Sequence, residues 1–363
     1  MLGRASHGAL LCAAMALLVS ASACDVVSSG ESDQQKATAC EKPPSVPFSG
    51  SSVAKVPKDV PKPKSAKLTI AYANGLDASE PLHVEGLAAK AEVERLGGSF
   101  ITDDAKGQPD LQVSQIQQFI ARKVDGIFVS VVDPGALSPV LRQAKDAGIP
   151  VVGVEVDLES TDPPEGWASQ IWLGRDKLAY LQTQHLARRV PCKGAYAHID
   201  LAIRVPAIEY VVKRARFWAG KFGLKALGTS SNPTGDIPGG GQAMTKLLAK
   251  YPSVDGVLAY HDASATGARA SARASGKPQL PVIGANGDSL GFQSVRSGKI
   301  SATVQMQYVD AGRIGAWALH HLVAGEEVPK TVRTGDPRLI TKANVDSVPT
   351  WPEQLEKRYG ASE

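Results

Sequence analysis

Short apolar segments rich in β-branched residues alternate with amphipathic segments through most of the chain. In the first half, the apolar segments lie at Leu68–Ala73, Ser99–Thr102, Gly126–Val132 and Val151–Val156. Between them, apolar residues recur at helical spacing, as at Val113, Ile116, Phe119 and Ile120. Regular alternation of strand and helix predicts a parallel sheet that is covered by helices on both faces.

The second half of the chain repeats the order of the first. Expected strands recur at Ala195–Ile199, Leu224–Leu227, Val257–Tyr260 and Val282–Ala285. Local sequence recurs as well, because VDGI at 124–127 returns as VDGV at 254–257, and PVVG at 150–153 returns as PVIG at 281–284. A duplication of this size predicts two similar Rossmann-like α/β lobes rather than a solenoid.

The first 24 residues have the pattern of an export signal. Arg4 supplies a positive charge, Ala9–Val19 is an apolar run, and small residues lead to Cys24. The run is shorter than the about 20 apolar residues that span a bilayer as a helix, so we expect it to be cleaved. The segment resembles a bacterial lipoprotein signal, which implies removal of residues 1–23 and acylation of Cys24 as the membrane anchor. An ordinary cleaved signal with an incidental cysteine is the alternative.

Residues 24–66 are predicted to form a tether behind this anchor. Ser, Gly, Gln and Asp dominate its first part, and Pro and Lys are dense from Lys55 to Lys64, a composition that favours an extended spacer. The lysines are either solvated or in contact with anionic lipid headgroups. Cys40 in the tether and Cys192 in the body are candidates for a disulfide in an oxidising compartment.

Composition excludes several classes of protein. The chain has 363 residues, of which 43% are apolar and 21% charged, so it is neither disordered nor fibrous and has room for two or three domains. The run from Lys55 to Lys67 contains five Lys and one Asp, a net charge of +4 that equals the charge of the whole chain, so little basic excess remains elsewhere to indicate nucleic acid. We find no spacing typical of a catalytic triad, a metal site or a P-loop, and therefore expect no enzymatic activity, no metal and no cofactor.

Polar side chains follow the expected strands, where ligands bind in open parallel sheets. They include Asn74, Asp77, Asp133, Glu155 and Asp157 in the first half, and His261, Asp262 and Asn286 in the second. Such hydrogen-bonding and acidic residues suit a hydroxylated or weakly cationic small molecule better than a phosphate or a lipid.

Several motifs occur in a specific order: VDGIFVS at 124–130, GIPVV at 148–152, HDASATGA at 261–268, VIGANG at 282–287 and SGKISATV at 297–304. Together they resemble type I periplasmic binding proteins of the ribose/galactose class, the solute-binding subunits of ABC importers. The resemblance implies two lobes that are joined by three hinge crossovers and close around a solute. It places the crossovers near Leu173, Gln305–Gln307 and Thr331.

By the same resemblance, the N-terminal lobe comprises 67–173 and 307–330, the C-terminal lobe comprises 174–306 and 331–345, and 346–363 form a tail. We expect a monomer that is held at the cell envelope by its lipid, on the periplasmic face of an inner membrane or the outer face of a plasma membrane. It would deliver a sugar-like solute to an ABC permease. A sensor that presents its closed form to a chemoreceptor or histidine kinase is the alternative.

The chain departs from the family pattern at several contact positions. An Asp-Arg pair is expected where Glu155 and Val156 stand, so the carboxylate is kept and the guanidinium is missing. His261 and Asn286 replace an Asn and an Asp. These departures predict a ligand other than ribose or galactose.

Two further positions are assigned by the resemblance. Arg216, with Arg214 as a rival, matches an arginine that bonds ligand hydroxyls, and Trp172 is the best placed tryptophan for stacking on a sugar. The complete predicted ligand-binding set is Asn74, Asp77, Glu80, His83, Asp133, Glu155, Asp157, Trp172, Arg216, His261, Asp262, Asn286, Gln305 and Gln307.

Overall fold

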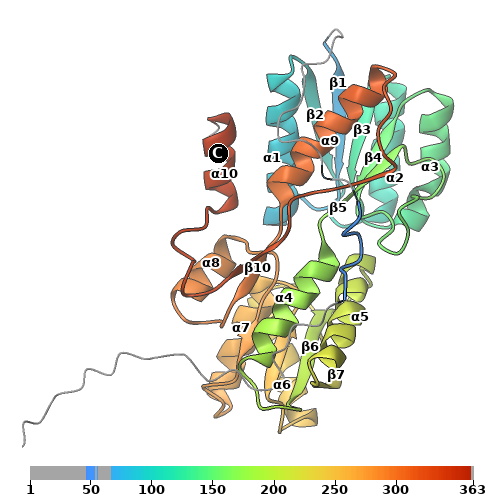
Figure 1. The fold of residues 1–363 in the computed structure, drawn as a ribbon. Helices are drawn as coiled ribbons and strands as arrows, with labels where there is room; N and C mark the ends of the chain where they lie inside the picture. Colours follow the sequence, from blue (N-terminus) through green and yellow to red (C-terminus); the bar gives the residue numbers. More distant parts are fainter. Residues whose placement is uncertain (1–45, 54, 56–66, 361–363) are drawn as a thin grey trace, which may run out of the picture. The chain divides into compact units, whose positions relative to one another are not determined.

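The computed structural model describes residues 46–53, 55 and 67–360 (Figure 1). The predicted signal, Cys24, Cys40 and most of the predicted tether lie outside these residues. No helix in the described part of the chain combines the length and hydropathy needed to cross a bilayer.

A six-stranded parallel sheet with the order β11-β5-β4-β3-β1-β2 forms the first lobe. Its strands are β1 (Thr69–Asn74), β2 (Ser99–Asp104), β3 (Gly126–Ser130), β4 (Val151–Val154), β5 (Ser169–Trp172) and β11 (Thr331–Arg333). One face packs on α1 (Glu80–Arg95) and α9 (Tyr308–Val323), the other on α2 (Pro109–Ala121) and α3 (Pro134–Asp146). Burial of both faces explains why the inner strands β1, β3 and β4 are nearly continuous apolar runs.

A four-stranded parallel sheet with the order β7-β6-β8-β9 forms the second lobe. Its strands are β6 (Ala195–Leu201), β7 (Lys225–Asn232), β8 (Gly256–Ala259) and β9 (Val282–Ile283). One face packs on α4 (Arg175–Ala187) and α5 (Pro206–Lys221), the other on α6 (Ile237–Lys250) and α7 (Asp262–Ala274). The repeated VDG segments begin β3 and β8, and the repeated PV segments begin β4 and β9, so the predicted two-lobed α/β fold is confirmed.

Additional elements border the second sheet. The strand β10 (Thr303–Gln305) pairs antiparallel with β12 (Arg338–Ile340). Isolated parallel β-bridges join Ile283 of β9 to Ala302 and Asn286 to Gln305 of β10. Helix α8 (Ser289–Arg296) lies between β9 and β10 in the chain and packs on α7 and β10.

Within residues 67–360 the chain passes between the lobes four times, one more than expected, because α10 (Trp351–Tyr359) returns to the first lobe after β12 (Arg338–Ile340). The first passage follows β5, the second precedes α9, and the third lies between β11 and β12. The third differs from the expectation at Thr331, because Thr331–Arg333 pairs with Gln170–Trp172 and extends the first sheet. The chain therefore stays on the first lobe at least to Thr334, which is buried and whose amide donates to the Trp172 carbonyl at 3.0 Å.

The C-terminal segment is folded, which corrects the expectation of a tail over 346–363. Helix α10 (Trp351–Tyr359) packs on α1 and α9. Trp351 is buried, its Nε1 donates to the Met306 carbonyl at 2.9 Å, and its ring packs edge-on against Tyr308. A capping box formed by Thr350 and Glu353 begins the helix.

The end of the predicted tether is also packed on the protein. Phe48 lies among aromatic rings of α4 and α5, and the Val53 carbonyl accepts a hydrogen bond from Arg333. A spacer over all of 24–66 is therefore wrong for residues 46–53 and 55, because an aromatic side chain at 48 finds an apolar site. Cys192 is disulfide-bonded, whereas Cys40, its predicted partner, lies outside the described residues.

Candidate ligand-binding site

A buried polar cluster lies at the carboxyl ends of β1 and β3. Glu85 of α1 is fully buried, and its Oε1 accepts hydrogen bonds from Tyr72 Oη at 3.1 Å and Ser130 Oγ at 2.8 Å. Its Oε2 has no partner among the described residues. Burial raises the pKa of Glu85 from 4.5 to about 8, so at neutral pH it is a carboxylic acid with an O–H to donate.

An ion pair borders this cluster at the first crossover. Glu155 follows β4 with a φ of +55°, and Arg175 is the first residue of α4. Arg175 Nε donates to the two Glu155 oxygens at 3.0 and 2.8 Å, and its Nη2 donates to Tyr308 Oη at 3.0 Å. The Arg175 side chain is 12% exposed and the Glu155 side chain 6% exposed. Glu155 and Arg175 are close enough to influence the pKa of Glu85.

Arg175, Tyr308 and Glu85 were not among the predicted site residues. Arg175 supplies the guanidinium that seemed lost at Val156, but it comes from the next helix rather than from the strand end. A charged residue directly after the predicted crossover was the signal that could have found it. Glu85 carries no comparable signal, because a glutamate in a helix is usually solvated.

Three predicted residues form one network after β1. Asn74 is buried and its Nδ2 donates to Asp77 Oδ1 at 2.8 Å, while His83 Nδ1 lies 3.0 Å from the same oxygen. Asp104, at the end of β2, accepts from the Asp77 amide at 3.0 Å. The loop after β1 therefore holds its polar side chains at the strand ends.

Glu80 connects the first lobe to the second. Both of its carboxylate oxygens lie 3.1 Å from the Ser289 amide at the start of α8, and Ser289 Oγ donates to Oε1 at 2.7 Å. The neighbouring Asp288 has its pKa raised to about 6 by burial and by the charge of Glu80. A second connection joins Lys213 Nζ of α5 to Glu159 Oε1 at 2.7 Å.

The predicted residues of the second lobe mainly organise its loops. His261 caps α7 by accepting from the Ser264 amide, and its ring stacks on Tyr260 with a centroid separation of 4.0 Å. Asp262 is buried and accepts from the Gly287 and Asp288 amides at 2.9 and 3.2 Å. Burial, followed by the charge of Asp288, raises the pKa of Asp262. The backbone of Asn286, with a φ of +86°, forms an isolated β-bridge with that of Gln305.

Four of the five other predicted residues make side-chain contacts within the protein, whereas Gln307 Nε2 has no partner among the described residues. Asp133 caps α3, and the Asp157 carboxylate accepts from the Glu159 and Ser160 amides. Trp172 is 6% exposed and its Nε1 donates to the Asp157 carbonyl at 2.8 Å, an environment typical of packing rather than stacking on a ligand. Gln305 Nε2 donates to the Pro349 carbonyl at 2.9 Å. Gln307 precedes α9 with a buried Nε2 that has no described partner.

The two arginines proposed for the second lobe have different environments. Arg214 Nε and Nη2 donate to Asp176 at 2.7 and 3.0 Å, and this pairing joins α5 to α4. Arg216 is exposed and lines a pocket of about 460 Å³ at the carboxyl ends of β6 and β7, together with Asp200 and Arg204. The described contacts bring neither arginine to Glu85 or Arg175.

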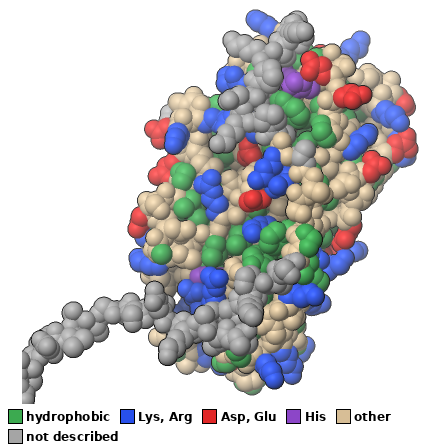
Figure 2. Space-filling model, viewed as in Figure 1, with side chains coloured by type: hydrophobic (Ala, Val, Ile, Leu, Met, Phe, Trp, Pro, Cys, Tyr) green, Lys and Arg blue, Asp and Glu red, His purple; other side chains and the backbone are tan. Residues whose placement is uncertain are grey.

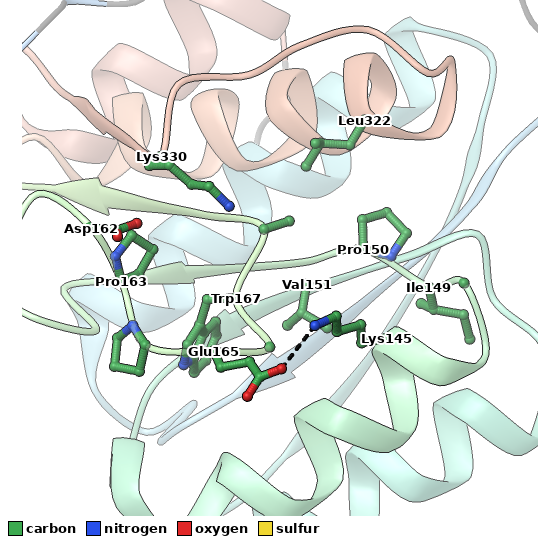
Figure 3. Close-up of a pocket in the computed structure, with 14 residues that line it drawn as sticks. Lys145, Ile149, Pro150, Val151, Asp162, Pro163, Glu165, Trp167, Leu322 and Lys330 are labelled. Atoms are coloured by element: carbon green, nitrogen blue, oxygen red, sulfur yellow. Dashed lines mark hydrogen bonds and ion pairs between the residues drawn. The ribbon is translucent and has the colours of Figure 1, made fainter.

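A larger pocket of about 690 Å³ lies elsewhere, at the amino ends of β4 and β5 (Figure 3). Its wall includes Trp167 and Lys330, and Lys145 Nζ pairs with Glu165 Oε1 at 2.9 Å. This pocket lies at the amino ends of the strands, whereas Glu155 follows the carboxyl end of β4. It is therefore separate from the predicted site.

Charges of both signs lie on the face of the molecule that Figure 2 shows. The basic and acidic side chains are interspersed there, which agrees with the nearly neutral composition of the folded part. In the described part of the chain, no three or more His, Cys, Asp or Glu side chains are grouped to hold a metal ion.

Two curated proteins illustrate the sequence relatives of the chain. The ribose import binding protein of Bacillus subtilis is 26% identical over 242 residues, covering 66% of this chain and 77% of the relative. The xylitol-binding protein of Mycolicibacterium smegmatis is 24% identical over 280 residues, covering 72% and 73%.

Solved structures share the fold. A solute-binding protein of an ABC transporter from Actinobacillus succinogenes with bound D-allose aligns with a TM-score of 0.70 at 21% identity, covering 78% of this chain and all (100%) of that one. One from Mycobacterium smegmatis with bound glycerol gives 0.68 at 24% identity, covering 78% and 96%. The model of the periplasmic binding protein domain matches residues 85–327. This match covers more than half of the chain, which therefore belongs to the periplasmic binding protein family.

Proposed function

We propose that this protein is the extracytoplasmic solute-binding component of an ABC importer and binds a neutral sugar or polyol between its lobes. The relatives named for ribose and xylitol support this solute class. The observation that carries the proposal is the buried cluster of Glu85, Glu155, Arg175 and Tyr308, which keeps hydrogen-bonding capacity at Glu85 Oε2.

The charge balance of the cluster favours an uncharged ligand. Arg175 is paired with Glu155, and the raised pKa of Glu85 keeps that carboxyl protonated at neutral pH. A carboxylate or amine placed here would add an unpaired charge in a desolvated setting, which is costly. Hydroxyl groups can both donate to and accept from such neutral partners. The replacements at 155, 261 and 286 support a polyhydroxyl solute other than ribose or galactose.

Lobe closure provides the mechanism. A solute that contacts both lobes stabilises the closed arrangement, because only differential affinity for that arrangement can shift the equilibrium. The contacts of Glu80 with Ser289 and of Lys213 with Glu159 join the two lobes and would be among those that closure forms. The closed surface would dock on the permease, and acylated Cys24 would hold the binder at the membrane. No catalytic step is part of this function.

Thermal-shift and calorimetric titrations test the proposal. The chain from Cys24 onward, with Cys24→Ser to prevent acylation, is screened against neutral pentoses, hexoses and polyols and against amino acids and carboxylic acids. A neutral solute at 100 times Kd should stabilise the protein by about 2.7 kcal/mol. Arg175→Ala should abolish the shift and Lys145→Ala, in the separate pocket, should not. Selective binding of carboxylic acids or amino acids would contradict the proposal.

A further inference from the structure

Residues 46–53 and 55, here called the hinge strap, contact the second lobe through Phe48. The Phe48 ring lies 4.9 Å from the Tyr180 ring and 5.4 Å from the Trp218 ring between centroids. Lys177 Nζ lies 4.0 Å from the Phe48 ring centroid. The next residue, Ser49, donates its amide to Asp176 Oδ2 at 2.7 Å. The strap is therefore anchored to α4 and α5 by aromatic packing and by a charge-assisted hydrogen bond.

The same strap contacts the first lobe a few residues later. Gly50 has a φ of +75°, and a Cβ there would lie 2.6 Å from Trp172 Cε3 at the end of β5. The Val53 carbonyl accepts from Arg333 Nε at 2.9 Å. The backbone of Lys55 forms an isolated parallel β-bridge with that of Arg333. Lys55 Nζ forms an ion pair with Asp336 Oδ2 at 3.5 Å. The required backbone conformation and the close approach to Trp172 make glycine the only residue that fits at position 50 without strain.

These contacts flank two of the passages between the lobes. Trp172 and Asp176 bracket the passage from β5 to α4, and Arg333 and Asp336 lie where β11 leads toward β12. In Figure 1 the strap is the blue segment that runs from the first lobe toward α5. Val53 follows Phe48 by five residues, so the Cα atoms of these two residues can be at most about 18 Å apart. The Ser51 amide donates to the Phe48 carbonyl and the Val53 amide to the Gly50 carbonyl, both at 3.0 Å, so the strap is folded into turns. A rotation that separates the two attachment sites would break these turns or release one end.

We propose that the hinge strap is an additional, noncovalent connection between the lobes that favours the arrangement in which Glu80 contacts Ser289. This inference goes beyond solute binding, because it concerns the equilibrium between open and closed forms without solute. Docking of the strap requires the spacing between the Phe48 site and Arg333 that this arrangement provides. Opening loses strap contacts, so docking lowers the open population. The strap also joins the predicted tether to the hinge, which couples the anchored end of the chain to lobe closure.

The experiment measures lobe opening directly and uses no solute. Spin labels are placed through Lys90→Cys on α1 and Lys246→Cys on α6, both exposed positions, in the Cys24→Ser chain. Pulsed electron paramagnetic resonance then gives the distribution of distances between the two spin labels, one on each lobe. Phe48→Ala removes the anchor on the second lobe, and Gly50→Ala disturbs the anchor on the first. Ser52→Ala, at an exposed position of the strap, is the matched control.

Phe48→Ala and Gly50→Ala should each raise the ratio of open to closed molecules about tenfold, and Ser52→Ala should leave it unchanged. A tenfold change corresponds to about 1.4 kcal/mol. Hydrogen exchange of the Ser49 amide reports whether the strap is released, and a cooperative melting transition shows that each variant is folded. Release of the strap with an unchanged distance distribution overturns the proposal. This result would leave the proposed solute binding untouched, since no solute is present.

Discussion

Arg175 Nε lies 3.0 and 2.8 Å from the two carboxylate oxygens of Glu155 and so joins the first residue of α4 to the residue that follows β4. The pair links the start of the second lobe to the strand ends of the first. Because both side chains are largely buried, removal of one leaves the other without a counter-charge.

Arg175→Ala should therefore lower the free energy of unfolding by about 3 kcal/mol, since breaking a buried pair from one side leaves an uncompensated charge. Urea denaturation at pH 7 measures the change. Arg204→Ala, which breaks the exposed pair with Glu209, should cost less than about 1 kcal/mol. If the two variants are equally stable, Arg175 does not neutralise a buried charge.

Glu85 makes stability depend on pH. Its pKa in the folded protein is raised from 4.5 to about 8 by burial, so the native state keeps a proton that the unfolded chain loses within this window. The contribution of Glu85 to stability is fully present below pH 4.5 and decreases as pH rises toward 8, by at most about 1.4 kcal/mol per pH unit. Glu85→Gln should remove this dependence. Denaturation at a series of pH values would test the prediction, which fails if the two proteins have the same profile between pH 5 and 8.

Glu80→Gln should lower the pKa of Asp288. Burial is the larger cause of the raised value of about 6, and the charge of Glu80 adds to it. The pKa should therefore fall by a few tenths of a pH unit and stay above 3.8, the usual value. Carboxyl chemical shifts in an NMR titration measure the change. An unaltered Asp288 titration would show that the two carboxylates are not close in solution.

A disulfide-linked peptide that contains Cys40 and Cys192 is expected in a digest of non-reduced protein. Cys192 is disulfide-bonded, and Cys40 is the cysteine of the predicted mature chain that does not carry the lipid. Mass spectrometry before and after reduction identifies the pair. Recovery of Cys192 linked to Cys24 would contradict both this pairing and acylation of Cys24.

Trp351→Ala should reduce the free energy of unfolding by about 3–5 kcal/mol, the usual cost of removing a buried tryptophan. The ring is buried beside Tyr308 and its Nε1 donates to the Met306 carbonyl. Glu356→Ala, at an exposed position of the same helix, should change stability by less than about 0.5 kcal/mol. Thermal and urea unfolding compare the two, and equal stability would mean that α10 is not docked.

The architecture could be predicted from the sequence alone because the burial of strands and helices determines the pattern of apolar positions along the chain. Strands such as Ile70–Ala73 are covered on both faces and are therefore apolar throughout, and the repeated VDG and PV segments mark equivalent strand starts in the two lobes. The position of strand ends followed from the same pattern, which is why Asn74 and Asp77 were predicted at one strand end, where a hydrogen bond joins them.

The pairing of polar groups was decided by the tertiary structure. Glu155 and Arg175 stand 20 residues apart, and the pairing of β4 with β5, which ends just before α4, brings them together. Glu85 looks like an ordinary helical glutamate until β1 and β3 bury it against Tyr72 and Ser130. Phe48 lies in a segment whose composition predicts a spacer, and its site exists only once α4 and α5 are packed. Hydrophobic periodicity records which positions are buried, but the partner of a buried polar group depends on the register and crossing of elements that are distant in sequence.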